Sequence, residues 1–139
     1  MDFPVKAEEL IPQGKPIVLV DRLLECNETK AISDFVVRDD GVFVEDGLLA
    51  SAGILENIAQ TCALRIGCLN SDQPVRIGVI GAVKNFAVNR LPKIGEVLTT
   101  TVQDILYFGT ALVVSAETRI GDESVAVCEM KVFLVENGE

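Results

Sequence analysis

Glu56 is a carboxylate inside a long apolar segment, residues 48–69, whose only other charge is Arg65. In a helix, positions i and i+4 share a face, so Gln60 would lie one turn from Glu56. A carboxylate in apolar surroundings is unfavourable unless it is hydrogen-bonded, and such groups concentrate at functional sites. Glu56 and Gln60 are therefore the candidate catalytic pair.

The same residues also fit a plainer interpretation. Asn57 stands beside Glu56, and Arg65 follows further along the segment. Polar residues on one face of a helix often mark a solvated edge. The sequence leaves both interpretations open.

Residue counts exclude several chemistries. The chain has no histidine, so Ser–His, Cys–His and His–metal chemistry cannot come from this chain alone. The four cysteines form no CxxC pair, which favours reduced thiols packed in the core and predicts no metal site. They are Cys26, Cys62, Cys68 and Cys128.

Length and composition predict one domain over residues 1–139. The chain is 49% hydrophobic and only 5% aromatic, so its core must be aliphatic. The net charge of −9 argues against a nucleic-acid or anionic-membrane partner. The start lacks a signal-peptide pattern, and the apolar segment contains too many polar and small residues for a membrane span. We therefore expect a cytoplasmic protein.

The hydrophobic pattern predicts one helix, from about Ser51 to Cys68, among several strands. A hairpin precedes a loop at 39–47, and four strands follow the helix. This order indicates an α+β fold, with a long central helix wrapped by a curved, mostly antiparallel sheet. The expected strand regions are 15–28, 29–40, 75–88, 96–108, 110–120 and 124–135.

Two features concern packing. Small residues recur along the helix, so a sheet could approach its backbone closely. The strand at 75–88 is too apolar to remain a free edge, which predicts a homodimer or a place in a heterodimer. The small residues are Ala52, Gly53, Ala59 and Ala63.

Two blocks of the sequence together resemble the β-hydroxyacyl-acyl carrier protein dehydratases. Residues 11–25, IPQGKPIVLVDRLLE, resemble the family's L-P-H-R-x-P-F-L-L-V-D-R-V opening. Residues 42–63 line up with H-F-P-G-x-P-x-x-P-G-V-L-x-x-E-x-x-A-Q, which places Glu56 and Gln60 on its conserved letters.

A third block, residues 80–98, is similar to the family's G-x-x-x-x-x-F-x-x-x-V-x-P-G-D segment through Gly81 and Phe86. The resemblance covers nearly the whole chain. It extends to the divergent branch found with aryl-polyene biosynthesis genes.

This resemblance implies a hotdog fold, usually paired into a dimer. In the family, the His of H-F-P-G from one subunit and the helical Glu from the other form the acid–base pair. Glu56 occupies the Glu position, whereas Val42 stands at the His position. Gln13 replaces the other family His, and Glu45 replaces the glycine of H-F-P-G.

The implied activity is dehydration of a 3-hydroxyacyl thioester, carried by acyl carrier protein or CoA, in fatty-acid or polyene-type lipid biosynthesis. No cofactor is implied. Glu56 would act as acid, held by Gln60, but Val42 cannot act as base, so turnover should be very weak or absent. The implied substrate-binding residues are Val42, Phe43, Ser51, Ala52 and Gly81.

Two other functions stay open. The chain could be a non-catalytic subunit or acyl-binding module, possibly paired with an active homologue. It could also be a hotdog thioesterase in which Glu56 activates water or attacks directly, because some of those enzymes need no histidine.

An acyl carrier protein is acidic, so it would need a basic surface to dock on. Lys84, Arg90 and Lys93 gather around one strand end and its turn, and they are the candidate docking residues. Scattered solubilising charge is the alternative explanation.

Overall fold

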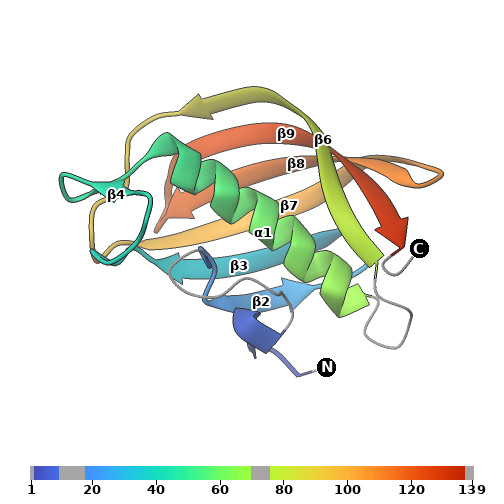
Figure 1. The fold of residues 1–139 in the computed structure, drawn as a ribbon, viewed down its shortest axis with the longest axis horizontal. Helices are drawn as coiled ribbons and strands as arrows, with labels where there is room; N and C mark the ends of the chain where they lie inside the picture. The colour runs from blue at the N-terminus through green and yellow to red at the C-terminus, as the bar shows by residue number, and fades with distance from the viewer. Residues whose placement is uncertain (1, 10–17, 70–75, 137–139) are drawn as a thin grey trace.

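In the computed structural model, one long helix lies against a seven-stranded antiparallel sheet (Figure 1). The structure describes residues 2–9, 18–69 and 76–136. The helix is α1, Ser51–Leu69, which confirms the predicted span to within one residue. The sheet order is β1-β2-β3-β7-β8-β9-β6. The strands are β1 Val5–Lys6, β2 Arg22–Cys26, β3 Lys30–Val36, β6 Arg76–Val88, β7 Val97–Phe108, β8 Ala111–Ile120 and β9 Glu123–Glu136.

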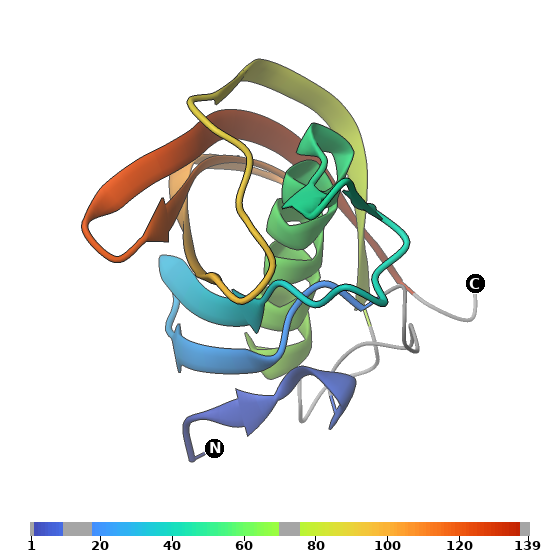
Figure 2. The same cartoon turned by 90° about the vertical axis from the view of Figure 1, so that its left-hand side faces the viewer.

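The sheet curls around α1, with β2 and β3 on one side of the helix and β6 on the other (Figure 2). The predicted α+β architecture is therefore confirmed. The long strand β6 pairs only with β9 and stands at one end of the sheet. Several of its apolar side chains are exposed, including Val79 and Val83.

Four short elements were not predicted. The expected loop at 39–47 contains most of a small hairpin of β4, Val44–Glu45, and β5, Leu48–Leu49. Asp46 and Gly47 both have positive φ, as a tight two-residue hairpin turn requires. Near the start of the chain lie β1 and a 3₁₀ turn, Ala7–Glu9.

Two expectations fall partly or wholly outside the described residues. Residues 10–17 hold Gln13 and the first part of the family-like block at 11–25, and residues 70–74 were expected to end the helix. Within the described part, the first hairpin is β2 and β3, joined around Asn27.

One face of α1 buries aliphatic side chains against the sheet, among them Ile54, Ile58 and Leu64. The opposite face of the helix is less well covered. Ala52 is exposed, and Ala59 and Ala63 are only partly buried, because the sheet curls past α1 without closing over this face. No helix in the described part of the chain is long and apolar enough to cross a bilayer.

A buried ion pair fixes α1 to β7. Arg65 is 6% exposed, and its two terminal nitrogens meet both carboxylate oxygens of Asp104. The guanidinium also donates to the carbonyl oxygens of Asn27 and Glu28, at 3.4 and 2.5 Å. One side chain therefore ties the helix to β7 and to the turn between β2 and β3.

Arg65→Met should destabilise the protein by about 3–5 kcal/mol, because it leaves the Asp104 carboxylate buried without a cation. Urea unfolding measures the change in the free energy of unfolding. The double variant Arg65→Met/Asp104→Leu should lose less free energy of unfolding, since no unpaired buried charge remains. A single-variant cost below about 0.5 kcal/mol, as for a surface substitution, would contradict this assignment.

Candidate active site

The site is built on Glu56, which α1 carries on its partly covered face. The Gln60 amide Nε2 donates to Glu56 Oε1 at 3.1 Å, as their spacing of one helical turn predicts. The Gln60 amide oxygen accepts the Leu19 backbone N–H at 2.7 Å. Because that oxygen is engaged, the NH₂ side of the amide faces Glu56. The carboxylate therefore meets a fixed donor.

Asn57 also anchors the backbone segment at Leu19. Its Nδ2 donates to the Leu19 carbonyl oxygen at 2.5 Å, so Asn57 and Gln60 hold both backbone groups of Leu19. The Asn57 Oδ1 in turn accepts the Thr100 hydroxyl of β7 at 2.7 Å. Sequence reasoning missed this residue, because an Asn beside a Glu carries no signal of its burial.

The solvated-edge interpretation loses its two supporting residues, because neither Asn57 nor Arg65 lies at the surface. Asn57 is 0% exposed and Arg65 is 6% exposed. Both are buried in hydrogen-bond networks, since the sheet and the segment before β2 cover them. Glu56 itself is partly buried. The two polar residues that supported a wet edge are therefore structural anchors.

A cavity of about 120 Å³ opens beside Glu56 and Gln60. Ala59 and Ala63 lie on the same helical face as Glu56 and leave the space that larger residues would fill. Ile80 of β6 and Val132 of β9 form the facing wall. Ala59 and Ala63 are two of the small residues expected to let the sheet approach the helix closely. The structure shows that their small size leaves a cavity. The other lining residues are Cys62 and Ile66.

Cys62 is a thiol in the wall of this cavity, and it is not a candidate nucleophile. Burial raises its pKa to about 12, so the thiol stays neutral at physiological pH. Burial likewise raises the pKa of Cys128 to about 11. The carboxylate of Glu56 is therefore the reactive group to consider here.

The start of α1 presents two of the predicted substrate-binding residues. Ser51 and Ala52 are exposed in the first turn, where backbone N–H groups have no acceptor within the helix. Glu56 lies one turn after Ala52 on the same face. These amides and the carboxylate could therefore act on one bound molecule.

The loop before α1 places two other predicted substrate-binding residues, Phe43 and Val42, in different surroundings. Phe43 packs into the core, and its backbone oxygen accepts the Ala50 N–H at 2.8 Å. A Cβ on Gly53 would come within 2.8 Å of Phe43, so the loop can approach the helix because of this glycine. Val42 is 58% exposed and does not line the described cavity beside Glu56.

Gly81 is also not among the described residues that line the cavity beside Glu56. The Phe133 ring lies over it, and a Cβ there would approach the ring to 2.3 Å. Its neighbour Ile80 is the residue that reaches the cavity. A bulge between Ile80 and Ala82 marks this point of β6.

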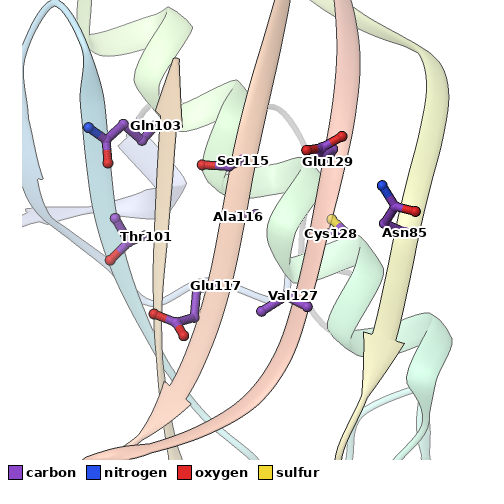
Figure 3. A pocket seen from close by; sticks show the side chains of 9 residues that line it. All are labelled: Asn85, Thr101, Gln103, Ser115, Ala116, Glu117, Val127, Cys128 and Glu129. Atoms are coloured by element: carbon purple, nitrogen blue, oxygen red, sulfur yellow. The ribbon is translucent and has the colours of Figure 1, made fainter. Parts of the chain in front are cut away.

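A larger hollow, of about 450 Å³, lies elsewhere on the sheet. Figure 3 shows its side chains in front of strands β6 to β9, with α1 behind them. Hydroxyl, amide and carboxylate groups dominate, as on a solvated sheet face. None of the predicted site residues lines it. The lining residues are Asn85, Thr101, Gln103, Ser115, Ala116, Glu117, Val127, Cys128 and Glu129.

The three basic residues predicted to dock a carrier protein differ in their surroundings. Lys84 and Lys93 are exposed. Arg90 forms ion pairs with Glu96 and Glu123, each at 2.8 Å. Its charge is thus offset by two carboxylates. Through them, Arg90 ties the connection between β6 and β7 to the start of β9.

Comparison with known proteins decides the family. Residues 5–139 match the ApeP-like family, described as ApeP dehydratase. The chain belongs to the ApeP-like dehydratase family. This confirms the resemblance to the aryl-polyene-associated branch of the dehydratases. No curated protein matches the chain.

Solved structures confirm the hotdog fold. The dehydratase heterocomplex ApeI:P of Xenorhabdus doucetiae matches with a TM-score of 0.85 at 16% identity, over 97% of this chain and 94% of that one. The PaaI protein of the E. coli phenylacetic acid degradation operon gives 0.66 at 16% identity, over 80% of each chain. A hypothetical thioesterase from Streptococcus pneumoniae, solved with coenzyme A, gives 0.68 at 13% identity over 82% and 84%.

The Arg90 cluster predicts a pH dependence of stability. The Arg90 guanidinium, with the Lys93 backbone N–H, lowers the pKa of Glu96 from 4.5 to about 2. A lowered folded-state pKa stabilises the fold above the unfolded pKa, and this stabilisation is lost as the pH falls toward 2. The difference in free energy of unfolding between wild type and Arg90→Met should therefore be largest above about pH 5 and shrink through pH 4.5 to 2.

Chemical denaturation across this pH range measures that difference. In a Glu96→Gln background, the Arg90 substitution should show little of this acid-range change. A difference that stays constant from pH 6 to pH 2 would contradict the role of Glu96.

Proposed function

We propose that this chain contributes the Glu56 half of a dehydratase site that acts on a 3-hydroxyacyl thioester. The observation that carries the proposal is the fixed carboxylate beside an apolar cavity: Gln60 holds Glu56, and the Leu19 N–H holds Gln60. The family membership of the chain supports the same chemistry.

The reaction removes a proton from C2 and breaks the bond between C3 and its hydroxyl oxygen, so that a C2–C3 double bond forms. Glu56 protonates the departing oxygen, which leaves as water. The free N–H groups of the first turn of α1, at Ser51 and Ala52, polarise the thioester carbonyl and stabilise charge on its oxygen. A base must take the C2 proton.

That base comes from a second hotdog chain in this proposal. This sequence has no histidine, and Val42 stands where the family has one. A structural neighbour belongs to the dehydratase heterocomplex ApeI:P, which supports pairing of this chain with a different, His-bearing chain. The exposed apolar edge strand β6 is the proposed pairing surface. Such a heterodimer has one complete site, because the site that includes Val42 lacks its base.

The cavity along Ala59 and Ala63 accepts the acyl group beyond C3. It extends from Glu56 on the side away from the first turn of α1, so a substrate would lie along the helix. A cavity of 150 Å³ holds benzene, so this chain's own cavity of about 120 Å³ suits roughly six carbons or fewer. Lys84 and Lys93 remain the proposed contacts for an acidic carrier protein, whereas Arg90 already has two carboxylate partners.

Val42→His should raise dehydratase activity on a short 3-hydroxyacyl thioester by about 10²–10⁴-fold, the usual contribution of a positioned acid or base. Enoyl-thioester absorbance measures turnover. Val42→Ala is the matched control and should show no gain. Val42→His/Glu56→Gln should lose the gain.

Other outcomes of this assay would overturn the proposal. If the wild type turns over as fast as a working dehydratase, and Glu56→Gln abolishes this turnover, the site must contain another base. Release of free thiol in place of enoyl thioester would identify a thioesterase, and no product from folded Val42→His would favour a non-catalytic subunit.

Ala63→Leu in the Val42→His background should shorten the accepted acyl chain. Each methylene that no longer fits is worth about 1–3 kcal/mol, or roughly 10–200-fold in kcat/KM. The ratio of kcat/KM for six-carbon and four-carbon substrates measures the effect, and the four-carbon substrate serves as the internal control. An equal loss on both substrates would place the acyl group elsewhere.

A further inference from the structure

Asn57 does not line the cavity beside Glu56, yet it is fully buried and bonded on both sides of its amide. Its Nδ2 donates to the Leu19 carbonyl at 2.5 Å, and its Oδ1 accepts the Thr100 hydroxyl at 2.7 Å. Thr100 also lies 2.8 Å from the Thr118 hydroxyl of β8. A chain of polar groups therefore runs from the middle of the sheet to the segment before β2.

The directions of these hydrogen bonds are linked. The Thr100 hydroxyl has one proton, and it donates that proton to Asn57 Oδ1. Thr118 must then be the donor to Thr100. Because Oδ1 is the acceptor, the NH₂ side of Asn57 is turned toward Leu19. The Leu19 carbonyl can only accept, so it sets the orientation of the Asn57 amide, and the Thr100 and Thr118 hydroxyls turn to match it.

The same logic continues to Glu56. Asn57 holds the Leu19 carbonyl, and the Leu19 N–H points to the Gln60 amide oxygen at 2.7 Å. This leaves the Gln60 NH₂ facing the Glu56 carboxylate at 3.1 Å. If the Gln60 amide were turned over, its oxygen would face the carboxylate and repel it.

We propose that Asn57 is a positioning residue for Glu56. It fixes the Leu19 segment, the segment fixes the orientation of the Gln60 amide, and the amide orients the carboxylate. The consequence for catalysis rests on the proposed dehydratase function. The orientation of Gln60 can be tested without any activity.

The substitution Asn57→Asp tests this chain of contacts, because it keeps the shape of the side chain. When ionised, the introduced carboxyl still accepts from Thr100 but cannot donate to Leu19. When protonated, it can do both, as the amide does. The hydrogen-bond partners at this position, namely Leu19, Thr61 and Thr100, carry no charge, and burial without a cation favours the protonated form in acid.

The main readout is the Gln60 side-chain amide signal in ¹⁵N–¹H NMR spectra, assigned with Gln60→Glu. In N57D at neutral pH, this signal should lose the shift caused by the hydrogen bond to Glu56. It should return toward the wild-type position, compared at the same pH, when the sample is acidified. In the Val42→His background, N57D should lower kcat by about 10²-fold, the cost of a small misplacement, with little change in KM.

The matched control is Thr61→Val/Ser33→Ala, which removes another buried hydroxyl pair next to Asn57, at 2.7 Å, without touching Leu19. It should leave the Gln60 signal unchanged. An unchanged Gln60 signal in N57D at neutral pH would overturn the proposal, as would an equal change in the control. If the N57D signal behaves as expected but Val42→His is inactive, the positioning role stands and the dehydratase function fails.

Discussion

The structure around the site depends on one buried peptide segment, at Leu19, that has no strand partner. Its N–H and carbonyl groups must be satisfied, because unpaired backbone groups in a core are costly. Gln60 and Asn57, three residues apart on α1, meet both groups. The same hydrogen bonds orient the amide that faces Glu56. The hydrogen bonds that satisfy the Leu19 backbone are therefore the same ones that arrange the site.

The two faces of α1 have different roles. One face buries Ile54, Ile58 and Leu64 in the sheet, and Arg65 anchors the far end through Asp104. The opposite face keeps Glu56 beside small residues, where the curled sheet leaves a cavity. A rigid helix fixed on one side can thus present a carboxylate to a substrate on the other.

The absence of histidine from the sequence limits what this site can do alone. The proposed reaction needs an acid and a base, and this chain offers a well-held carboxylate at Glu56, whereas the exposed Val42 has no ionisable group. The open edge of β6 and the retained arrangement around Glu56 are both consistent with a subunit that completes another chain's site.

The sequence by itself determined the helix, the main strands, and the pairing of Glu56 with Gln60, since local periodicity and i, i+4 spacing carry that information. Its motifs also identified the family. Only the tertiary structure showed that Asn57 and Arg65 are buried anchors, because their partners lie 37 to 43 residues away along the chain. The cavity wall at Ile80, the cover of Phe133 over Gly81 and the ion pairs of Arg90 likewise arise from contacts between distant strands. No local pattern records such contacts, because they exist only once the strands have paired and the sheet has packed against the helix.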